Sequence, residues 1–330
     1  MKSAVVGIGT IGPVHLDALT RLGEEIAALC DIRPERAVAA AERFHLSCPI
    51  FTDYEEMLDQ VRPDIVHICT PHFCHADMIV AALTRGISVL CEKPLCIKES
   101  DIGRILAAEA ASPAKLGVCH QNRTNPANLF ARRLFSENRV TAAHGSVVWH
   151  RDAAYYGQDA WRGKWKTEGG GVLINQALHT LDLCQWFFGM PTRLSASVAN
   201  LSLPSVIEVE DTAFLRCRGR TDFTFVATVG SAGDLPVSVT ARLADGREVV
   251  VLPHAVIVAG QTAFFEEKIK TPGKCCYGNG HIRLIGDFYR CVRTDEPFEV
   301  SGREAARVVR MILAAYRSGG QEVETGGEII

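Results

Sequence analysis

The chain has 330 residues, of which 47% are hydrophobic and 22% are charged, and its formal net charge is −3. This length exceeds what one hydrophobic core usually organises, so we expect two domains in a globular protein. Charges are nearly balanced and no basic cluster stands out, which argues against a nucleic-acid partner. No apolar run approaches the ~20 residues that span a bilayer, which argues against a membrane protein.

The twelve cysteines indicate reduced thiols. Cys30, Cys69 and Cys91 lie in apolar strand patterns, where a thiol behaves as a small hydrophobic group. No C-x-x-C pair occurs, so we expect neither a metal site nor disulfides. Because Met1-Lys2 leads directly into the first strand without a cleavable leader, we expect a cytoplasmic protein.

The first predicted strand ends in a glycine-rich loop. Gly7, Gly9 and Gly12 have the G-x-G-x-x-G spacing, which lets a strand turn tightly into a helix and lets the backbone approach a diphosphate at the helix N-terminus. A second apolar strand ends at Asp31, 22 residues after Gly9, where an acid accepts the hydroxyls of an adenosine ribose. This context predicts a dinucleotide site.

Strands and helices alternate through the first 120 residues. Helices are predicted at 13–22, 34–44, from 54, 75–85 and 98–111, and strands at 26–31, 50–51, 65–69, 88–91 and 116–119. That alternation is typical of parallel βαβ units. We therefore expect an α/β protein whose residues 1–122 form a dinucleotide-binding Rossmann domain with a doubly wound parallel sheet.

The pattern changes after residue 122. Helices are predicted at 126–137, 172–188, 281–293 and 303–317, and β-rich runs fill most of 193–267, with Asp245-Gly246 as the clearest hairpin turn. Residues 123–330 are therefore expected to form an α+β domain for substrate binding and oligomerisation. Its large, mostly antiparallel open sheet would have one face free for another layer or subunit.

Glu92-Lys93-Pro94 directly follows the fifth predicted strand. A doubly wound sheet binds its ligand outside the carboxyl ends of its strands. A lysine there can hydrogen-bond a substrate hydroxyl and stabilise the alkoxide that develops as hydride leaves. We expect Pro94 to fix the turn that aims Lys93, through a cis peptide bond.

A polar cluster interrupts an otherwise apolar stretch after three glycines, Gly169 to Gly171. The glycines are predicted to open a helix on which Asn175 and His179, four residues apart, project from one face, with Gln176 offset. An imidazole titrates near neutrality, which suits a base that takes the proton of a substrate alcohol. A catalytic role is therefore predicted for His179.

Together these motifs resemble the Gfo/Idh/MocA family of nicotinamide-dependent sugar oxidoreductases, along nearly the whole chain. The resemblance includes Thr70-Pro71 with His75, Glu92-Lys93-Pro94, Gln121 with Arg123 and Pro126, Trp161-Arg162-Gly163 with Trp165, the stretch from Gly169 to Asp182, and Val209-Glu210-Asp211-Thr212. It implies hydride transfer between a nicotinamide and a secondary alcohol or ketone of a sugar, cyclitol or nucleotide sugar. It also implies a homodimer or homotetramer formed through the C-terminal sheet.

Carried onto this sequence, the resemblance makes Lys93 the catalytic lysine and His179 the acid/base histidine. Asn175 departs from the pattern, because many members hold an aspartate there, and either His179 or Lys93 could be the proton acceptor. The expected cofactor-binding residues are Gly7, Gly9, Thr10, Ile11, Gly12, Asp31, Arg36, Thr70, Pro71, His75, Glu92, Lys93, Gln121, Trp161 and Arg162. The expected substrate-binding residues are Lys93, Arg123, Tyr156, Trp165, Asn175, Gln176 and His179.

Three alternatives stay open at this point. NAD is favoured over NADP because Asp31 would repel a 2′-phosphate, although Arg33 and Arg36 could accept one. The same fold resembles glycosidases that retain NAD and regulators that bind a dinucleotide without catalysis. Lys93 and His179 argue against a regulator, because a sensor needs no positioned proton acceptor.

Overall fold

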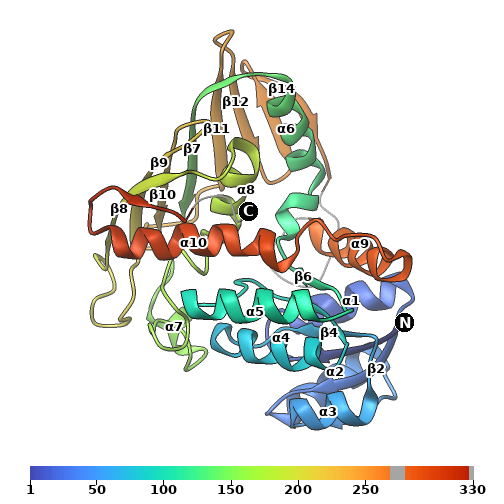
Figure 1. Cartoon of the computed structure of the whole chain (residues 1–330). Helices are drawn as coiled ribbons and strands as arrows, with labels where there is room; N and C mark the ends of the chain where they lie inside the picture. The colour runs from blue at the N-terminus through green and yellow to red at the C-terminus, as the bar shows by residue number, and fades with distance from the viewer. Residues whose placement is uncertain (268–278, 327–330) are drawn as a thin grey trace. The chain divides into compact units, whose positions relative to one another are not determined.

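The computed structural model describes residues 1–267 and 279–326, which form two compact units (Figure 1). The first unit contains Met1–Gln121 and the described part of Ile269–Ala306, and the second contains the described parts of Asn122–Lys268 and Arg307–Ile330. The chain first passes from one unit to the other between Gln121 and Asn122. The later return to the first unit was not expected from the sequence.

The first unit holds a six-stranded sheet with the order β3-β2-β1-β4-β5-β6, and all of its strand pairs are parallel. Its elements are β1 (Lys2–Val6), α1 (Gly12–Leu22), β2 (Glu25–Cys30), α2 (Pro34–Phe44), β3 (Ile50–Phe51), α3 (Tyr54–Val61), β4 (Ile65–Ile68), η1 (His72–Cys74), α4 (His75–Thr84), β5 (Ser88–Cys91), α5 (Glu99–Ala111), β6 (Leu116–Val118), η2 (Gln121–Thr124) and α9 (Gly280–Thr294). This order confirms the predicted doubly wound Rossmann sheet. The last of its 3-10 turns, η2, continues into the second unit.

The helices of the first unit form two packed groups, in which α1 contacts α2 and α9 while α4 contacts α3 and α5 (Figure 1). Strands β4 and β5 are buried at every residue, as expected for central parallel strands that have helices on both faces. The return of the chain is explained by α9, whose Leu284, Ile285 and Phe288 join the same hydrophobic core as Leu16 and Leu19 of α1.

The second unit holds a nine-stranded sheet with the order β14-β13-β12-β11-β7-β10-β9-β8-β15. Its elements are α6 (Pro126–Glu137), β7 (Val140–Val148), α7 (Ala153–Gly157), α8 (Leu178–Phe188), β8 (Arg193–Ala199), β9 (Thr212–Arg218), β10 (Phe223–Thr228), β11 (Ser238–Leu243), β12 (Glu248–Leu252), β13 (Ala255–Val258), β14 (Gln261–Phe265) and β15 (Val323–Glu324). Helix α10 (Gly302–Ser318) begins in the first unit and ends in the second. Among the described strands of this sheet, only β7 and β10 pair in parallel, which confirms the mostly antiparallel open sheet.

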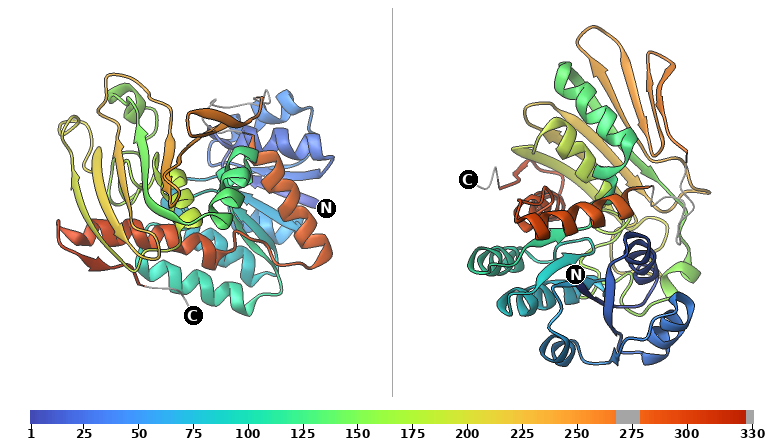
Figure 2. Two further views of the ribbon diagram at one scale, coloured as in Figure 1. Left: turned by 90° about the horizontal axis from the view of Figure 1, so that it is seen from above. Right: turned by 90° about the vertical axis from the view of Figure 1, so that its right-hand side faces the viewer.

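Helices α6 and α8 pack together on one face of this sheet (Figure 2). The predicted hairpin at Asp245-Gly246 is confirmed, because it joins the antiparallel strands β11 and β12 and Gly246 has a φ of 88°. Strand β7 was not predicted, since its Ala, Gly and Ser residues weaken the apolar alternation.

The predicted helix over 172–188 is wrong at its start. Residues 172–176 form hydrogen-bonded turns and α8 begins at Leu178. The amide of Ala177 donates to the carbonyl of Val172, five residues earlier, so the regular helical pattern is broken before His179. Asn175 and His179 therefore do not stand on one continuous helix.

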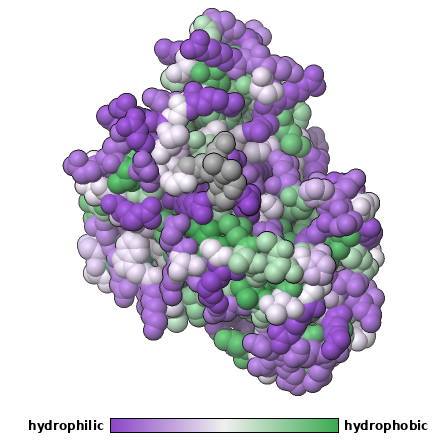
Figure 3. All heavy atoms as spheres, in the orientation of Figure 1, coloured by the Kyte–Doolittle hydropathy of each residue, from purple (hydrophilic) through white to green (hydrophobic). Residues whose placement is uncertain are grey.

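The view in Figure 3 shows a mainly hydrophilic surface with hydrophobic side chains in separate patches. Among the described residues, none of the helices combines the length and apolar character needed to cross a membrane.

Candidate active site

The glycine loop after β1 is built for close approach of a ligand backbone. Gly7 has a φ of 85°, and a Cβ there would lie 2.6 Å from the carbonyl carbon of Cys69, while a Cβ on Gly12 would lie 2.6 Å from the Gly7 oxygen. A Cβ on Gly9 would meet only the Nη1 of Arg36, at 3.8 Å. The loop is therefore tight at Gly7 and Gly12 and open at Gly9, which fits a dinucleotide diphosphate.

The N-terminus of α1, after Thr10 and Ile11, fits the same group. Within the described residues, α1 has no side-chain N-cap and no acid in its first turn, so its positive end is not neutralised by the helix itself. Asp31 is 6% exposed, and its carboxylate accepts hydrogen bonds from the amides of Ile8 (2.7 Å) and Arg33 (2.8 Å). Asp31 thus fastens the glycine loop to the end of β2 in addition to the expected ribose contact.

Behind Thr70-Pro71, His75 joins two loops through its imidazole. Its Nδ1 lies 2.6 Å from the Pro94 carbonyl oxygen and its Nε2 lies 2.9 Å from that of Thr70. The side chain is fully buried, and burial lowers its pKa. The expected cofactor contact of His75 is therefore corrected to a clamp between these loops. The cis peptide bond between Lys93 and Pro94 is confirmed.

Glu92 also differs from the expectation of a cofactor contact. Its carboxylate is buried, lies 3.0 Å from Nε2 of His15 and 3.7 Å from Nε2 of His281, and accepts the amide of Lys93 at 3.2 Å. Burial alone would raise the pKa of Glu92, but the interactions with His15 and His281 outweigh it and hold the pKa well below its usual range. Glu92 therefore fixes the backbone that carries Lys93.

A buried polar network extends from Glu92 and was missed by sequence reasoning. Nδ1 of His15 lies 2.8 Å from Nδ1 of His67, Nε2 of His67 lies 2.9 Å from the Tyr289 hydroxyl, and that hydroxyl lies 2.5 Å from Oγ of Ser3. A histidine inside the apolar strand β4 was the one available signal. The partners come from separate parts of the chain, so no local motif contains them.

Arg123 was predicted to bind substrate, and the structure corrects this. Its guanidinium is 1% exposed and forms a two-point ion pair with Asp182, with Nε to Oδ2 at 2.7 Å and Nη2 to Oδ1 at 2.6 Å. It also lies over the Trp186 ring, 5.6 Å from its centroid. The pair links η2 to α8 inside the second unit, and the neighbouring Gln121 is likewise buried.

The triglycine turn is held by Glu210. The Glu210 carboxylate accepts the amides of Gly171 (2.9 Å) and Leu173 (3.1 Å) and the Tyr316 hydroxyl (2.9 Å). A Cβ on Gly171 would lie 1.9 Å from the Glu210 carbonyl oxygen, so only glycine fits there. Burial raises the pKa of Glu210 to about 7, despite these hydrogen bonds.

This pKa predicts a pH dependence of folding stability. In the unfolded chain Glu210 titrates near its ordinary 4.5, so its contribution is complete below that pH and is lost as pH rises toward about 7. Relative to Glu210→Gln, the wild-type free energy of unfolding should fall between pH 4.5 and 7 by on the order of 3 kcal/mol. Urea unfolding of both proteins at pH 5 and pH 8 measures this, and a constant difference would contradict it.

Asn175 has a carboxylate partner that the sequence did not reveal. Oε1 of Glu168 lies 2.5 Å from Nδ2 of Asn175, and Oε2 of Glu168 accepts the Gly163 amide at 2.5 Å. Glu168 is fully buried. From residue 168 to 188 every residue is buried except Asn175 and His179, which are half-buried. The fold therefore leaves only the two predicted catalytic residues partly open in this stretch.

An arginine and aromatic rings lie beside this segment. Arg162 stacks over Tyr155 (4.8 Å to the centroid) and Trp161 (4.7 Å), and its Nη1 donates to the Tyr155 hydroxyl at 2.7 Å. Nε2 of Gln176 lies 3.3 Å from the same hydroxyl. Arg162, Trp161 and Gln176 therefore form one cluster.

Two other aromatic predictions have different outcomes. Tyr156 was expected to bind substrate, but it is 6% exposed and packs with Ile207 and Val209 in a small hydrophobic core, so it is corrected to a core residue. Trp165 is 44% exposed, and its Nε1 donates to the Glu208 carbonyl at 3.0 Å. Trp165 thus keeps an exposed ring face that remains a prediction for substrate binding.

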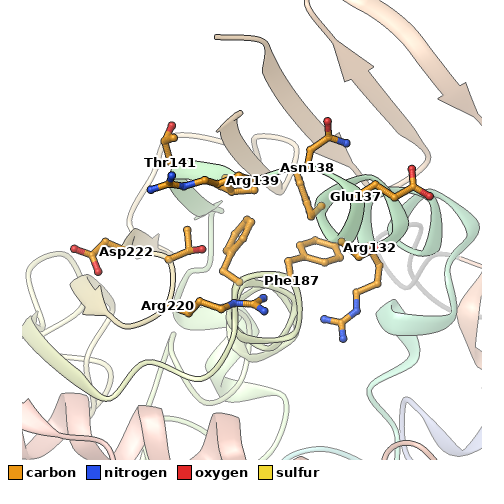
Figure 4. A pocket seen from close by; sticks show the side chains of 13 residues that line it. Arg132, Glu137, Asn138, Arg139, Thr141, Phe187, Arg220 and Asp222 are labelled. Carbon is orange, nitrogen blue, oxygen red and sulfur yellow. The ribbon is translucent and has the colours of Figure 1, made fainter. Parts of the chain in front are cut away.

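The second unit also contains a cavity of about 730 Å³ that lies among other residues (Figure 4). Arg132, Arg139 and Arg220 surround Phe187 there, together with acidic Glu137 and Asp222. None of the predicted site residues lines this cavity. This cavity is therefore not part of the candidate active site.

Comparison with known proteins agrees with these features. Residues 1–120 match the oxidoreductase family with an NAD-binding Rossmann fold, and residues 138–252 match the GFO/IDH/MocA C-terminal domain. The chain is 38% identical over 111 residues to inositol 2-dehydrogenase of Salmonella typhimurium, a match that spans only 33% of each chain. It is 28% identical over 215 residues to D-apiose dehydrogenase of Paraburkholderia graminis, covering 64% of this chain and 56% of that protein.

Among solved structures, the WlbA dehydrogenase from Bordetella pertussis, in complex with NADH and UDP-GlcNAcA, is similar over the whole chain. The two share 27% identity and a TM-score of 0.84, with 98% of each chain covered. Both matched domains and this full-length likeness point the same way as the glycine loop, Lys93 and the segment around His179. The chain therefore belongs to the Gfo/Idh/MocA family of oxidoreductases.

Proposed function

We propose that this protein is an NAD-dependent oxidoreductase that transfers a hydride between a nicotinamide and a secondary alcohol or ketone of a sugar, cyclitol or nucleotide sugar. The observation that carries the proposal is the partial exposure of Asn175 and His179 alone within the buried residues 168–188. Two polar residues that stay partly exposed inside an otherwise buried segment suit contact with a ligand.

The first unit supports the proposal through the order of its strands. The glycine loop follows β1 and Lys93 follows β5, and β4 alone separates these strands in the sheet. With neighbouring strands about 4.8 Å apart, the loop and Lys93 leave the same sheet edge about 10 Å from each other. A dinucleotide bound at Gly9 would extend along that edge towards Lys93.

When bound, the cofactor supplies the carbon that accepts or donates hydride. Glu92 holds the Lys93 backbone in place. From there the ammonium of Lys93 binds the reacting hydroxyl and stabilises its alkoxide character. The imidazole of His179 takes the proton, and Asn175 orients that imidazole. Asp31 favours NAD over NADP, because its carboxylate would repel the 2′-phosphate of NADP.

Three further features belong to the proposal. The aromatic rings of Trp161 and Trp165 suit the apolar faces of a sugar ring. The sheet face opposite α6 and α8 serves a homodimer or homotetramer. The ten free cysteines among the described residues agree with a reducing, cytoplasmic setting.

The experiment that tests this function is a substrate screen. Cyclitols, aldoses and nucleotide sugars are each incubated with NAD and with NADP, and reduced cofactor is followed by absorbance. We expect NADH formation with at least one member of these classes and weaker activity with NADP. Binding of NAD without turnover of any member would contradict the proposed reaction.

The Glu168 and Asn175 pair gives a second prediction, which rests on this function. Glu168→Gln removes the buried negative charge next to Asn175. A carboxylate near an imidazole favours its charged form, so the acidic limb of the pH–rate profile should move to lower pH in this variant. The pH dependence of kcat, measured for the wild type and the variant with a substrate found in the screen, tests this prediction.

The control variant restores a carboxylate, but at a different residue. The double variant Glu168→Gln/Asn175→Asp moves the negative charge from residue 168 to residue 175, where many family members carry it. Its pH–rate profile should resemble that of the wild type. If the single and double variants have the same profile, the charge of Glu168 does not act on the proton acceptor.

A further inference from the structure

Four buried side chains that can ligate a metal converge under the Glu92-Lys93-Pro94 turn. The ligand atoms of His15, Glu92 and Cys119 all lie within 4.8 Å of one another. His281 comes close to the same carboxylate, with its Nε2 3.7 Å from Oε1 of Glu92. All four residues belong to the first unit and are at most 6% exposed.

Three of the distances between these ligand atoms lie near those of a tetrahedral metal site. Metal–ligand bonds of about 2.0–2.3 Å separate the ligand atoms of such a site by roughly 3.3–3.8 Å. Here Nε2 of His15 lies 3.0 Å from Oε1 of Glu92 and 3.9 Å from Sγ of Cys119, and Glu92 lies 3.7 Å from His281. The atoms of His15, Glu92 and Cys119 form one compact group, and His281, which approaches the group at Glu92, would move towards the ion on binding.

We propose that His15, Glu92, Cys119 and His281 form a binding site for Zn²⁺ or a similar divalent transition-metal ion. Two neutral imidazoles, one carboxylate and one thiolate are ligands that zinc prefers. Their two negative charges balance the charge of the ion, so the occupied site is neutral in an apolar interior. The charge of the ion would offset part of the cost of burying the Glu92 carboxylate.

The surrounding hydrogen bonds match what a metal-bound histidine requires. A histidine that binds a metal through one nitrogen usually donates its other N–H to a fixed acceptor. With Nε2 of His15 on the metal, its Nδ1–H donates to Nδ1 of His67 at 2.8 Å, and Nε2–H of His67 donates to the Tyr289 hydroxyl at 2.9 Å. The tyrosine in turn donates to Ser3.

Binding exchanges a proton for the ion at Cys119. Coordination forms the S–metal bond and releases that proton to solvent. The bound ion would tie together α1, β6, α9 and the turn that carries Lys93, and this inference does not depend on the proposed reaction.

The test uses Co²⁺ as a spectroscopic probe for the full-length protein after chelator treatment. We expect one Co²⁺ per chain and a thiolate-to-cobalt absorption band, with Zn²⁺ displacing the probe. Cys119→Ser should abolish the band. His281→Gln should weaken binding by more than the about 10–100-fold that loss of an outer partner costs.

Cys96→Ser is the matched control. Cys96 is also a buried thiol of the first unit, and its Sγ donates to the Lys98 carbonyl at 3.4 Å, a bond that serine can keep. This variant should bind Co²⁺ like the wild type. A wild-type protein that binds no Co²⁺, or an unchanged band in Cys119→Ser, would overturn the proposal, and the wild-type titration decides even if a variant fails to fold.

Discussion

Lys93→Ala should lower kcat by about 10²–10³-fold, the range seen when one donor to a developing oxyanion is removed. The physical reason is the loss of the ammonium group that this turn offers to the reacting hydroxyl. Binding of NADH, measured by fluorescence titration, should change little, because the glycine loop and Asp31 stay intact.

The matched control for Lys93→Ala is Lys98→Ala, five residues further along. Lys98 is exposed and precedes α5, so its loss removes the same charge from the same segment without touching the turn. Its kcat should equal that of the wild type. Unchanged turnover in Lys93→Ala would remove this lysine from the mechanism, and an equal loss in both variants would indicate a general charge effect.

The second large effect concerns stability. Arg123→Met should lower the free energy of unfolding by about 3–5 kcal/mol, because it leaves the buried carboxylate of Asp182 without its cation. Replacing both partners by leucine should cost less than the single change, since no unpaired charge then remains in the interior. Urea unfolding monitored by tryptophan fluorescence measures all three proteins.

An exposed pair of the same type provides the comparison. Nε of Arg133 lies 2.9 Å from Oε1 of Glu137 on the surface of α6, with the side chains 82% and 57% exposed. Arg133→Met should change stability by less than about 1 kcal/mol, because exposed ion pairs are worth little. Similar losses for Arg123→Met and Arg133→Met would show that burial does not determine the effect.

The Rossmann half could be predicted closely from sequence because its signals are local. Helix α2 and strand β5 have the predicted bounds, since an apolar run or an amphipathic period identifies each of them within a few residues. The hairpin at Asp245-Gly246 was equally local. Strand β7 was missed, because its position in the sheet depends on β10 and β11, which lie far along the chain.

In the candidate site, too, local motifs could be predicted and contacts between distant residues could not. The glycine loop and the Lys93-Pro94 turn could be predicted from the sequence, because each is a short, continuous motif. The roles of Arg123 and Glu168 were not, since each depends on a partner brought in by folding, Asp182 and Asn175 respectively. No motif in the sequence indicates that His15, Glu92, Cys119 and His281 come together. Each of them lies in or next to a different helix or strand, and only folding brings them close.

The most direct measurement of the proposed reaction follows a deuterium atom. A substrate found in the screen is labelled with deuterium at its reacting carbon and incubated with NAD. We predict one released NADH per ketone formed, with the deuterium at C4 of its nicotinamide ring. Product that forms without labelled NADH in solution, as expected for an NAD-retaining glycosidase, would contradict the account.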